Sequence, residues 1–196
     1  MDESLPPIEP LALSGLLLIK PHRFRDERGE FLESFRQAWF DQLGLPYRFV
    51  QDNISRSGRG VIRGLHFQTG EHAQGKLITV ASGRILDVAV DIRLGSPTFG
   101  QWAAAELGEH NGHELWVPPG FAHGFAVLGD HAVVQYKCTT EYHRESERGI
   151  RWDDPALAID WQVPEPILSE KDRILPTLPE IPTHDLFTYP VNPPSS

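Results

Sequence analysis

The stretch RILDVAVDIR at residues 84–93 decides the fold, because apolar and polar side chains alternate along it. One face carries the apolar side chains Leu86, Val88, Val90 and Ile92. The opposite face carries Asp87, Asp91 and Arg93. A period of two residues is the period of a β-strand, whose successive side chains point to opposite faces. We therefore expect one face of this strand to meet a hydrophobic core and the other face to meet polar groups.

Short segments of the same kind recur along the chain, separated by Gly, Pro, Asn and Asp residues that favour turns. They are expected at residues 61–67, 76–81, 102–107, 114–117, 124–128 and 132–138. Regularly spaced short strands predict an all-β sandwich or barrel. The clearest helix is expected at residues 34–43, with Ser34 as its N-cap and Gly44 after its last turn.

The composition is typical of a soluble globular protein. The chain has 196 residues, of which 40% are hydrophobic and 23% charged, and it lacks the long apolar run that a membrane span requires. The formal net charge of −9 argues against general affinity for nucleic acid or anionic lipid. The N-terminal sequence MDESLPPIEP is acidic and Pro-rich, unlike a signal peptide, so a cytoplasmic location is expected. The single cysteine, Cys138, is expected to be buried and structural.

The composition of the sequence distinguishes one domain from a C-terminal tail. A domain of this length buries roughly 70% of its unfolded surface and supports one substantial core. We expect this domain at about residues 11–175. Proline is frequent after residue 163, and it disfavours both helices and central strands. Residues 176–196 are therefore expected to form an extended arm or a disordered tail, with disorder favoured for the last residues.

The candidate functional residues start from the stretch VIRGLHFQ at residues 61–68, a strand-like segment that nevertheless contains Arg63 and His66. Burying an ionisable side chain is costly unless it is paired, so these two residues face solvent or line a cavity that uses them. Gly64, between them, is expected at a turn or a close approach of two backbones. A small barrel can gather inward side chains from distant strands into one cavity. The polar residues on or beside predicted strands are Arg63, His66, Lys76, Asp87, His123 and Tyr136.

Several reaction classes lack their sequence motifs. The chain has no G-x-S-x-G nucleophile elbow, no P-loop and no G-x-G-x-x-G dinucleotide fingerprint. A metal site could be built from His66, Gln68, Glu71, His72 and His123. However, the pair of histidines two residues apart that many metal-binding barrels use is missing, because Gly64 and Gln68 flank His66 at that distance. Metal-free chemistry is therefore favoured, while a metal-dependent oxygenase and a non-catalytic binding module stay open as alternatives.

The remaining residue types suit acid–base chemistry next to a carbonyl group. A histidine can take a proton at neutral pH, and an aspartate partner fixes its tautomer. A tyrosine can return a proton, and a lysine can stabilise an enolate oxygen. Together these groups describe proton abstraction followed by reprotonation, which is epimerisation or isomerisation.

Ten segments, in order and spacing, resemble the dTDP-4-dehydrorhamnose 3,5-epimerase family from about residue 11 to 173. The segments are FRDERGEF (24–31), QDNISRS (51–57), VIRGLHFQ (61–68), QGKL (74–77), DVAVDIR (87–93), SPTFGQW (96–102), WVPPGFAHGF (116–125), YKCTTEY (136–142), ERGIRWDDP (147–155) and LSEKD (168–172). The resemblance implies a double-stranded β-helix of the cupin type, a jelly-roll barrel with few short helices, assembled as a homodimer. It also implies a dTDP-sugar substrate and an enzyme that uses no cofactor and no metal.

The reaction that the resemblance implies inverts C3 and C5 of dTDP-4-dehydro-6-deoxy-D-glucose and yields dTDP-4-dehydro-L-rhamnose. A 3- or 5-monoepimerase of the same family stays open as the nearest alternative. On the family's pattern His66 is the general base, Asp172 its carboxylate partner, Tyr136 the general acid and Lys76 the group that stabilises the enolate. Asp87 is a reserve candidate for the partner of His66. The positions that match nucleotide and sugar contacts are Arg25, Glu30, Gln51, Asn53, Arg63, His123, Glu147 and Lys171.

Overall fold

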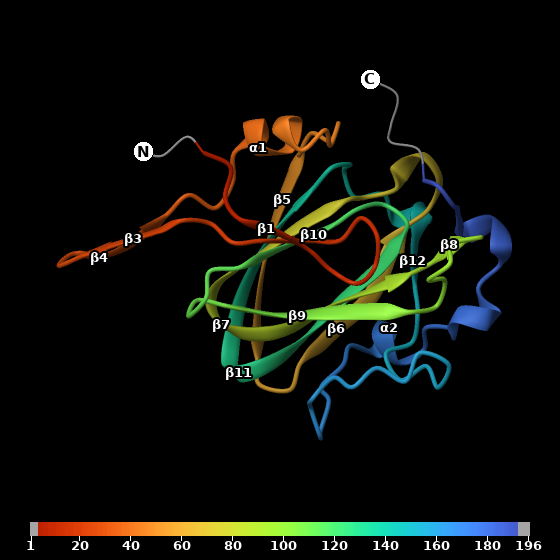
Figure 1. The fold of residues 1–196 in the computed structure, drawn as a ribbon. Helices are drawn as coiled ribbons and strands as arrows, with labels where there is room; N and C mark the ends of the chain where they lie inside the picture. The colour runs from red at the N-terminus through yellow and green to blue at the C-terminus, as the bar shows by residue number, and fades with distance from the viewer. Residues whose placement is uncertain (1–3, 192–196) are drawn as a thin grey trace.

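The computed structural model describes residues 4–191, and β-strands dominate this part of the chain (Figure 1). The strands are β1 (Ile8–Pro10), β2 (Leu17–Ile19), β3 (Arg23–Asp26), β4 (Gly29–Leu32), β5 (Gln51–Gly58), β6 (Ile62–Gln68), β7 (Lys76–Asp91), β8 (Arg93–Leu94), β9 (Trp102–Gly108), β10 (Glu114–Val117), β11 (Phe121–Cys138), β12 (Glu147–Gly149) and β13 (Phe187–Thr188). The helices are α1 (Gln37–Gln42), α2 (Glu170–Arg173) and the single 3₁₀ turns η1 (Gly70–His72), η2 (Arg144–Ser146), η3 (Leu178–Glu180) and η4 (Thr183–Asp185). The prediction of an all-β fold with a few short helices is confirmed.

The main sheet has the order β1-β2-β10-β7-β11-β6-β12, with β5 paired to β11 and β9 paired to β7. These pairs are antiparallel, and the two longest strands, β7 and β11, run side by side at the centre. The sequence predicted two strands in each of them, at 76–81 and 84–93 and at 124–128 and 132–138. The turn-forming residues between those segments instead mark irregularities in the β7–β11 register, near Gly83 and between Val127 and Ala132. Such bulges bend a strand without ending it.

Both faces of the β7 segment at residues 84–93 are buried. Leu86, Val88, Val90 and Ile92 join a cluster that includes residues from the C-terminal third of the chain. Ile85 and Ala89, on the opposite face, join a second cluster. Asp87 and Asp91 share this opposite face and are 0% exposed. The polar groups expected on one side of this strand therefore lie inside the protein, where they need partners.

Helix α1 begins at Gln37, three residues later than the sequence predicted, and Arg36 rather than Ser34 is its N-cap residue. The backbone of Arg36 is extended, so the chain turns into the helix only after it. Aromatic packing accounts for this entry, because the Phe35 ring meets the edge of the Phe49 ring at a centroid distance of 5.1 Å. Gly44 follows the helix with a φ of +68°, as a helix-ending glycine should.

Strand β5 was not predicted, and its composition explains why. Its inward positions are Asn53, Ser55 and Ser57, while Ile54 on the outward side is 60% exposed. The usual pattern of apolar residues inside and polar residues outside is therefore inverted. Asn53 and Ser55 line cavities, which is a reason for a strand to carry polar side chains on its inner face.

Residues 176–191 lie against the main sheet as an arm. Leu178 and Ile181 are each 6% exposed and belong to a core cluster, and β13 pairs in parallel with β8. The Arg93 guanidinium lies 4.4 Å from the Phe121 ring centroid and 5.2 Å from the Tyr189 ring centroid, so Tyr189 packs on a buried cation. The disorder favoured for the last residues falls on 192–196, outside the described residues, and the domain boundary at 175 stays a prediction. Within residues 4–191, no helix is long and apolar enough to span a membrane.

Glu114 is a buried acid in β10 and is not one of the residues predicted for the functional site. It is 0% exposed, and its Oε1 accepts a hydrogen bond from Thr79 Oγ1 at 3.0 Å. Its Oε2 has no hydrogen-bond partner among residues 4–191. Burial raises the pKa of Glu114 to about 8, because the Thr79 hydrogen bond and the charge of Lys137 offset the lost hydration only in part.

Replacing Glu114 by glutamine should change how the stability depends on pH. Because the folded-state pKa of about 8 lies above the ordinary 4.5, the folded protein keeps a proton that the unfolded chain releases. The free energy of unfolding therefore falls as pH rises through this window, by up to about 1.4 kcal/mol per pH unit. Glutamine does not titrate. Urea unfolding at about pH 5.5, 7 and 8.5 should therefore show that the free energy of unfolding of the variant, relative to that of the wild type, increases as pH rises. If the free energies of unfolding of the two proteins changed in parallel with pH, Glu114 would not be a buried neutral acid. Glu165→Gln, at an exposed position, is the matched control.

Candidate active site

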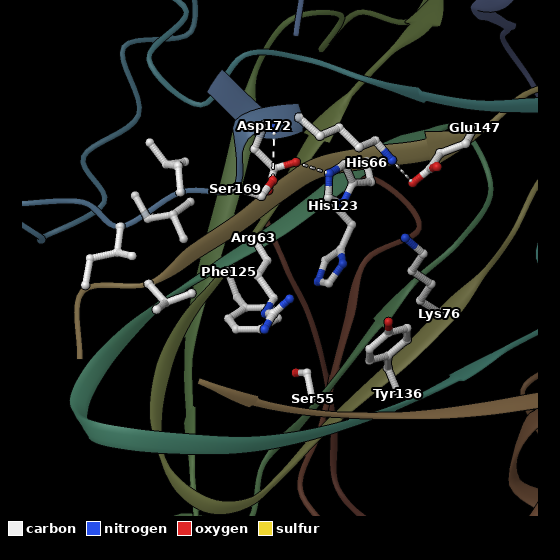
Figure 2. A pocket seen from close by; sticks show the side chains of 15 residues that line it. Ser55, Arg63, His66, Lys76, His123, Phe125, Tyr136, Glu147, Ser169 and Asp172 are labelled. Atoms are coloured by element: carbon white, nitrogen blue, oxygen red, sulfur yellow. Dashed lines mark hydrogen bonds and ion pairs between the residues drawn. The ribbon is translucent and has the colours of Figure 1, made fainter. Parts of the chain in front are cut away.

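A cavity of about 510 Å³ opens between the strands of the main sheet and the segment around α2 (Figure 2). Its polar lining comes from elements far apart in the sequence. The polar side chains are Ser55, Arg63, His66, Lys76, His123, Tyr136, Glu147, Ser169, Lys171 and Asp172. The apolar side chains are Val61, Ile62, Phe125, Ile167 and Leu168. The structure thus brings together eight of the residues that the sequence predicted for the site: Arg63, His66, Lys76, His123, Tyr136, Glu147, Lys171 and Asp172.

A second cavity of about 260 Å³ adjoins the first, because His66, Lys76, Tyr136 and Glu147 line both. It adds the predicted binding residues Gln51 and Asn53 from β5. It also adds Phe67, Gln68, Gln74, Cys138 and Tyr142. Cys138 is buried, as expected, and its sulfur accepts a contact from the Asn53 amide at 3.6 Å. The two cavities therefore share part of their lining.

His66 forms a hydrogen-bonded pair with Asp172, whose Oδ1 lies 2.6 Å from His66 Nε2. Asp172 is held by a short local structure, because it sits in α2 and its backbone N–H donates to the N-cap residue Ser169 at 3.1 Å. Burial by itself would raise the pKa of Asp172. Hydrogen bonds from His66, Ser169 and the Gly64 backbone outweigh burial and hold that pKa below its ordinary value.

The protonation of this pair follows from its chemistry. An ionised carboxylate can only accept hydrogen bonds. His66 Nε2 therefore carries the proton and donates a hydrogen bond to Asp172 Oδ1. The lone pair of a neutral His66 ring is then on Nδ1. The side chain is 27% exposed, which leaves it accessible to a ligand and to solvent protons. A histidine in this arrangement is equipped to act as a general base.

Lys76 and Tyr136 lie on the side of the cavity away from Asp172 (Figure 2). Burial lowers the pKa of the Lys76 amine, while the nearby thiol of Cys138 and the carboxylates of Asp87 and Glu147 work against that shift. Burial also raises the pKa of the Tyr136 phenol, with smaller contributions from its charged neighbours. A phenol with a raised pKa keeps its proton at neutral pH and can give it to a carbanion. A lysine beside it can stabilise negative charge on an oxygen.

Asp87 is not the partner of His66. Its Oδ1 lies 2.9 Å from His123 Nε2 instead, and the two residues lie on the neighbouring strands β7 and β11. The alternation along β7 placed Asp87 on the polar face of the strand. It gave no information on which of the two cavity histidines the carboxylate would meet, and the strand pairing decides that in favour of His123.

Glu147 and Lys171 both line the cavity and form an ion pair, with Lys171 Nζ 2.6 Å from Glu147 Oε1. The Glu147 carboxylate also accepts a hydrogen bond from the Tyr142 hydroxyl at 2.8 Å. Burial alone would raise the pKa of Glu147, but these two partners hold it below its ordinary value. Tyr142 and Ser169 were not predicted as site residues. Their only signal was their position inside the segments YKCTTEY and LSEKD.

Arg25 and Glu30 do not line either cavity. They lie on the β3–β4 hairpin, which projects away from the main sheet in Figure 1, and they pair with each other at 2.5 Å. Glu30 also accepts a hydrogen bond from Arg23. Within a single chain, these two predicted binding residues are separated from the rest of the site.

The predicted alternative of a metal site finds no ligand cluster in the described part of the chain. Among residues 4–191, no group of three or more His, Cys, Asp or Glu side chains has an arrangement that could hold a metal ion. His66 and His123 are each bound to one carboxylate. His72 stacks on His143 instead, with ring centroids 3.7 Å apart.

This sheet, with a histidine–carboxylate pair facing a tyrosine across a cavity, defines a β-sheet protein equipped for acid–base chemistry. The chain belongs to the dTDP-4-dehydrorhamnose 3,5-epimerase family, whose model matches residues 10–180. The curated dTDP-4-dehydrorhamnose 3,5-epimerase of Methanothermobacter thermautotrophicus is 51% identical over 176 residues, which cover 88% of this chain and 95% of the relative. The Escherichia coli protein of the same name is 52% identical and covers 86% of this chain and 92% of the relative.

Solved structures give the same result for the fold. A crystal structure of the 3,5-epimerase from Legionella pneumophila in complex with dTDP-4-keto-L-rhamnose matches with a TM-score of 0.90 and 49% identity. The match covers 93% of this chain and 98% of that chain. A 3'-monoepimerase from Streptomyces bikiniensis is more distant, with a TM-score of 0.84, 33% identity and 92% of both chains covered. The predicted cupin-type architecture of this family is confirmed.

Proposed function

We propose that this protein is a dTDP-4-dehydrorhamnose 3,5-epimerase that converts dTDP-4-dehydro-6-deoxy-D-glucose into dTDP-4-dehydro-L-rhamnose. The observation that carries the proposal is the His66–Asp172 pair on one side of the cavity, with Tyr136 on the other. Membership in the family and about 50% identity to curated 3,5-epimerases support the same substrate.

The chemistry follows from the C4 ketone of the substrate, which acidifies the protons at C3 and C5. His66 Nδ1 removes one of these protons, and the charge that develops on the C4 oxygen is stabilised by Lys76. Tyr136 then gives its proton to the same carbon from the opposite face, which inverts that centre. His66 has gained a proton and Tyr136 has lost one, so both must exchange with solvent before the second carbon reacts.

We propose that the remaining predicted residues bind the nucleotide and the sugar. Arg63 suits the diphosphate, because a planar guanidinium can bind two oxygens at once. Its Nε donates a hydrogen bond to Ser57 Oγ at 3.0 Å, which helps to fix the side chain. Gln51, Asn53, His123, Glu147 and Lys171 supply polar contacts along the two cavities.

Running the reaction in deuterated water tests the function. We expect solvent deuterium at both C3 and C5 of the 4-keto sugar, because each reprotonation uses a proton that exchanges with solvent. Mass spectrometry of the product after reduction counts the label, and NMR places it. Absence of label at both carbons would overturn the epimerase proposal.

Label at one carbon only would indicate the second candidate, a 3- or 5-monoepimerase. A curated 3-epimerase from Streptomyces niveus is also a relative, at 37% identity over 85% of this chain. The greater similarity to 3,5-epimerases favours double epimerisation. Stoichiometric transition metal with chelator-sensitive turnover would instead favour the oxygenase alternative, and binding without turnover would favour a binding module.

We also propose a homodimer, in which the β3–β4 hairpin of each subunit reaches the other. Phe24 and Phe31 on this hairpin are 48% and 55% exposed, and their rings lie 6.4 Å apart. A hairpin that exposes two aromatic rings needs a surface to cover them. The proposal would also bring Arg25 and Glu30 to a cavity, and sedimentation of Phe31→Ser as a monomer would support it. A cytoplasmic location is proposed as well, consistent with one buried, unbridged cysteine.

A further inference from the structure

A second histidine–carboxylate pair lies in the same cavity as the first. His123 and His66 are directly opposite each other in the β11–β6 pairing, and both line the cavity (Figure 2). His123 Nε2 lies 2.9 Å from Asp87 Oδ1, a distance close to that of the His66–Asp172 pair. One site thus contains two imidazoles, each oriented by its own carboxylate.

The two pairs differ in their access to solvent. The side chain of His66 is 27% exposed, whereas that of His123 is 8% exposed and that of Asp87 is 0% exposed. A base that works twice in one cycle must release its proton to water between the two steps. His66 has a route for that release, but His123 is closed in by the protein. The second pair is therefore better suited to holding a substrate group than to removing protons.

The hydrogen bonding of Asp87 fixes the tautomer of His123. The Oδ2 atom of Asp87 is buried and has no hydrogen-bond partner in the described part of the chain, so His123 supplies the contact that its carboxylate needs. An ionised carboxylate accepts, so His123 Nε2 carries the proton. The lone pair of the neutral ring is then on Nδ1.

We propose that Asp87 is a positioning residue that holds His123 as a hydrogen-bond acceptor for a hydroxyl group of the bound sugar. The assignment rests on the proposed function for the identity of the ligand, but the tautomer does not depend on it. A buried acceptor that receives a substrate hydroxyl discriminates against sugars that lack the hydroxyl, because the acceptor is then left without a partner. Asp87 would thereby contribute to specificity without touching the substrate.

The ¹⁵N resonances of histidine rings test the tautomer in the wild-type protein. Near neutral pH we expect His123 to show a protonated, pyrrole-type Nε2 and an unprotonated, pyridine-type Nδ1. Addition of dTDP-L-rhamnose, a stable nucleotide sugar, should shift the Nδ1 resonance as it accepts a hydrogen bond. A proton on Nδ1 in the free protein, or an Nδ1 resonance that the nucleotide sugar leaves unmoved, would overturn the proposal.

The variant Asp87→Asn tests the role, since an amide keeps the shape of the carboxylate and loses its charge. We expect KM to rise by about 3- to 10-fold, the size of one net hydrogen bond, with a smaller change in kcat. The dependence of kcat/KM on pH, which we attribute to His66, should be the same in Asp87→Asn as in the wild type. Asp172→Asn is the matched contrast and should lower kcat and change that profile.

A purely structural role for Asp87 would lower the melting temperature while leaving the His123 tautomer and KM unchanged, which would contradict the proposal. If Asp87→Asn fails to fold, the wild-type ¹⁵N measurement still decides. If the wild type binds dTDP-L-rhamnose with the expected shift but has no turnover, the proposed reaction fails and the positioning role stands.

Discussion

Replacing His66 by asparagine should lower kcat by about 10²–10⁴-fold, the usual contribution of a general base. The Asp172 carboxylate keeps its hydrogen bonds from the Ser169 side chain and the Gly64 backbone N–H, so it is not left buried without a partner. The variant should therefore fold and bind dTDP with nearly unchanged affinity. What it loses is the Nδ1 lone pair that accepts the proton from C3 or C5.

Deuterium wash-in separates the roles of the two catalytic groups more sharply than rates alone. The His66→Asn protein should show neither label nor inversion, because no proton is removed. Tyr136→Phe should still exchange deuterium into the 4-keto sugar from the face of His66, but without inversion, since the acid on the opposite face is gone. NMR of the unreduced sugar distinguishes label from inversion.

The matched control for His66→Asn is His131→Asn, because His131 lies outside both cavities and contacts Ser82 at 3.1 Å. It should retain wild-type turnover. Label and inversion at wild-type rates in His66→Asn would show that another group removes the protons. His123 would then be the first residue to test, as the second imidazole in the cavity.

The sequence predicted the strand residues of the site and could not predict how the remaining groups reach it. His66, Lys76, His123 and Tyr136 lie on segments whose composition and alternation indicate strands, and inward residues of one curved sheet converge. Asp172 is different, because α2 is a single short helix in an irregular segment. Periodicity carries no signal for such an element, so only the family resemblance pointed to this residue.

Two other limits have physical causes in particular residues. Strand β5 escaped prediction because Asn53 and Ser55 put polar groups on the inner face, where the alternation rule expects apolar ones. The C-terminal arm looked irregular because it is rich in proline. Its packing depends on Leu178, Ile181 and Tyr189 meeting surfaces formed by distant strands, and the spacing of prolines says nothing about those contacts.

Replacing Gly64 by alanine should destabilise the protein by about 3–5 kcal/mol, combining backbone strain with overpacking. The φ of Gly64 is +132°, a conformation that residues with a side chain rarely adopt. A Cβ atom there would lie 2.5 Å from the Gly124 Cα and 3.0 Å from the His123 carbonyl oxygen. Neither atom belongs to a flexible side chain, so β6 and β11 themselves would have to move apart.

That movement should also damage the active site, because Gly64 lies two residues before His66 and its N–H supports Asp172. We expect Gly64→Ala to lose most of its activity even at temperatures where it stays folded. Urea unfolding and turnover of the same preparation measure both effects. The control is Gly58→Ala at the end of β5, where an added Cβ has no neighbour within 4 Å and φ is not positive. Equal stability of Gly64→Ala and Gly58→Ala would contradict this prediction, because it would mean that β6 can move away from β11 without a cost in free energy.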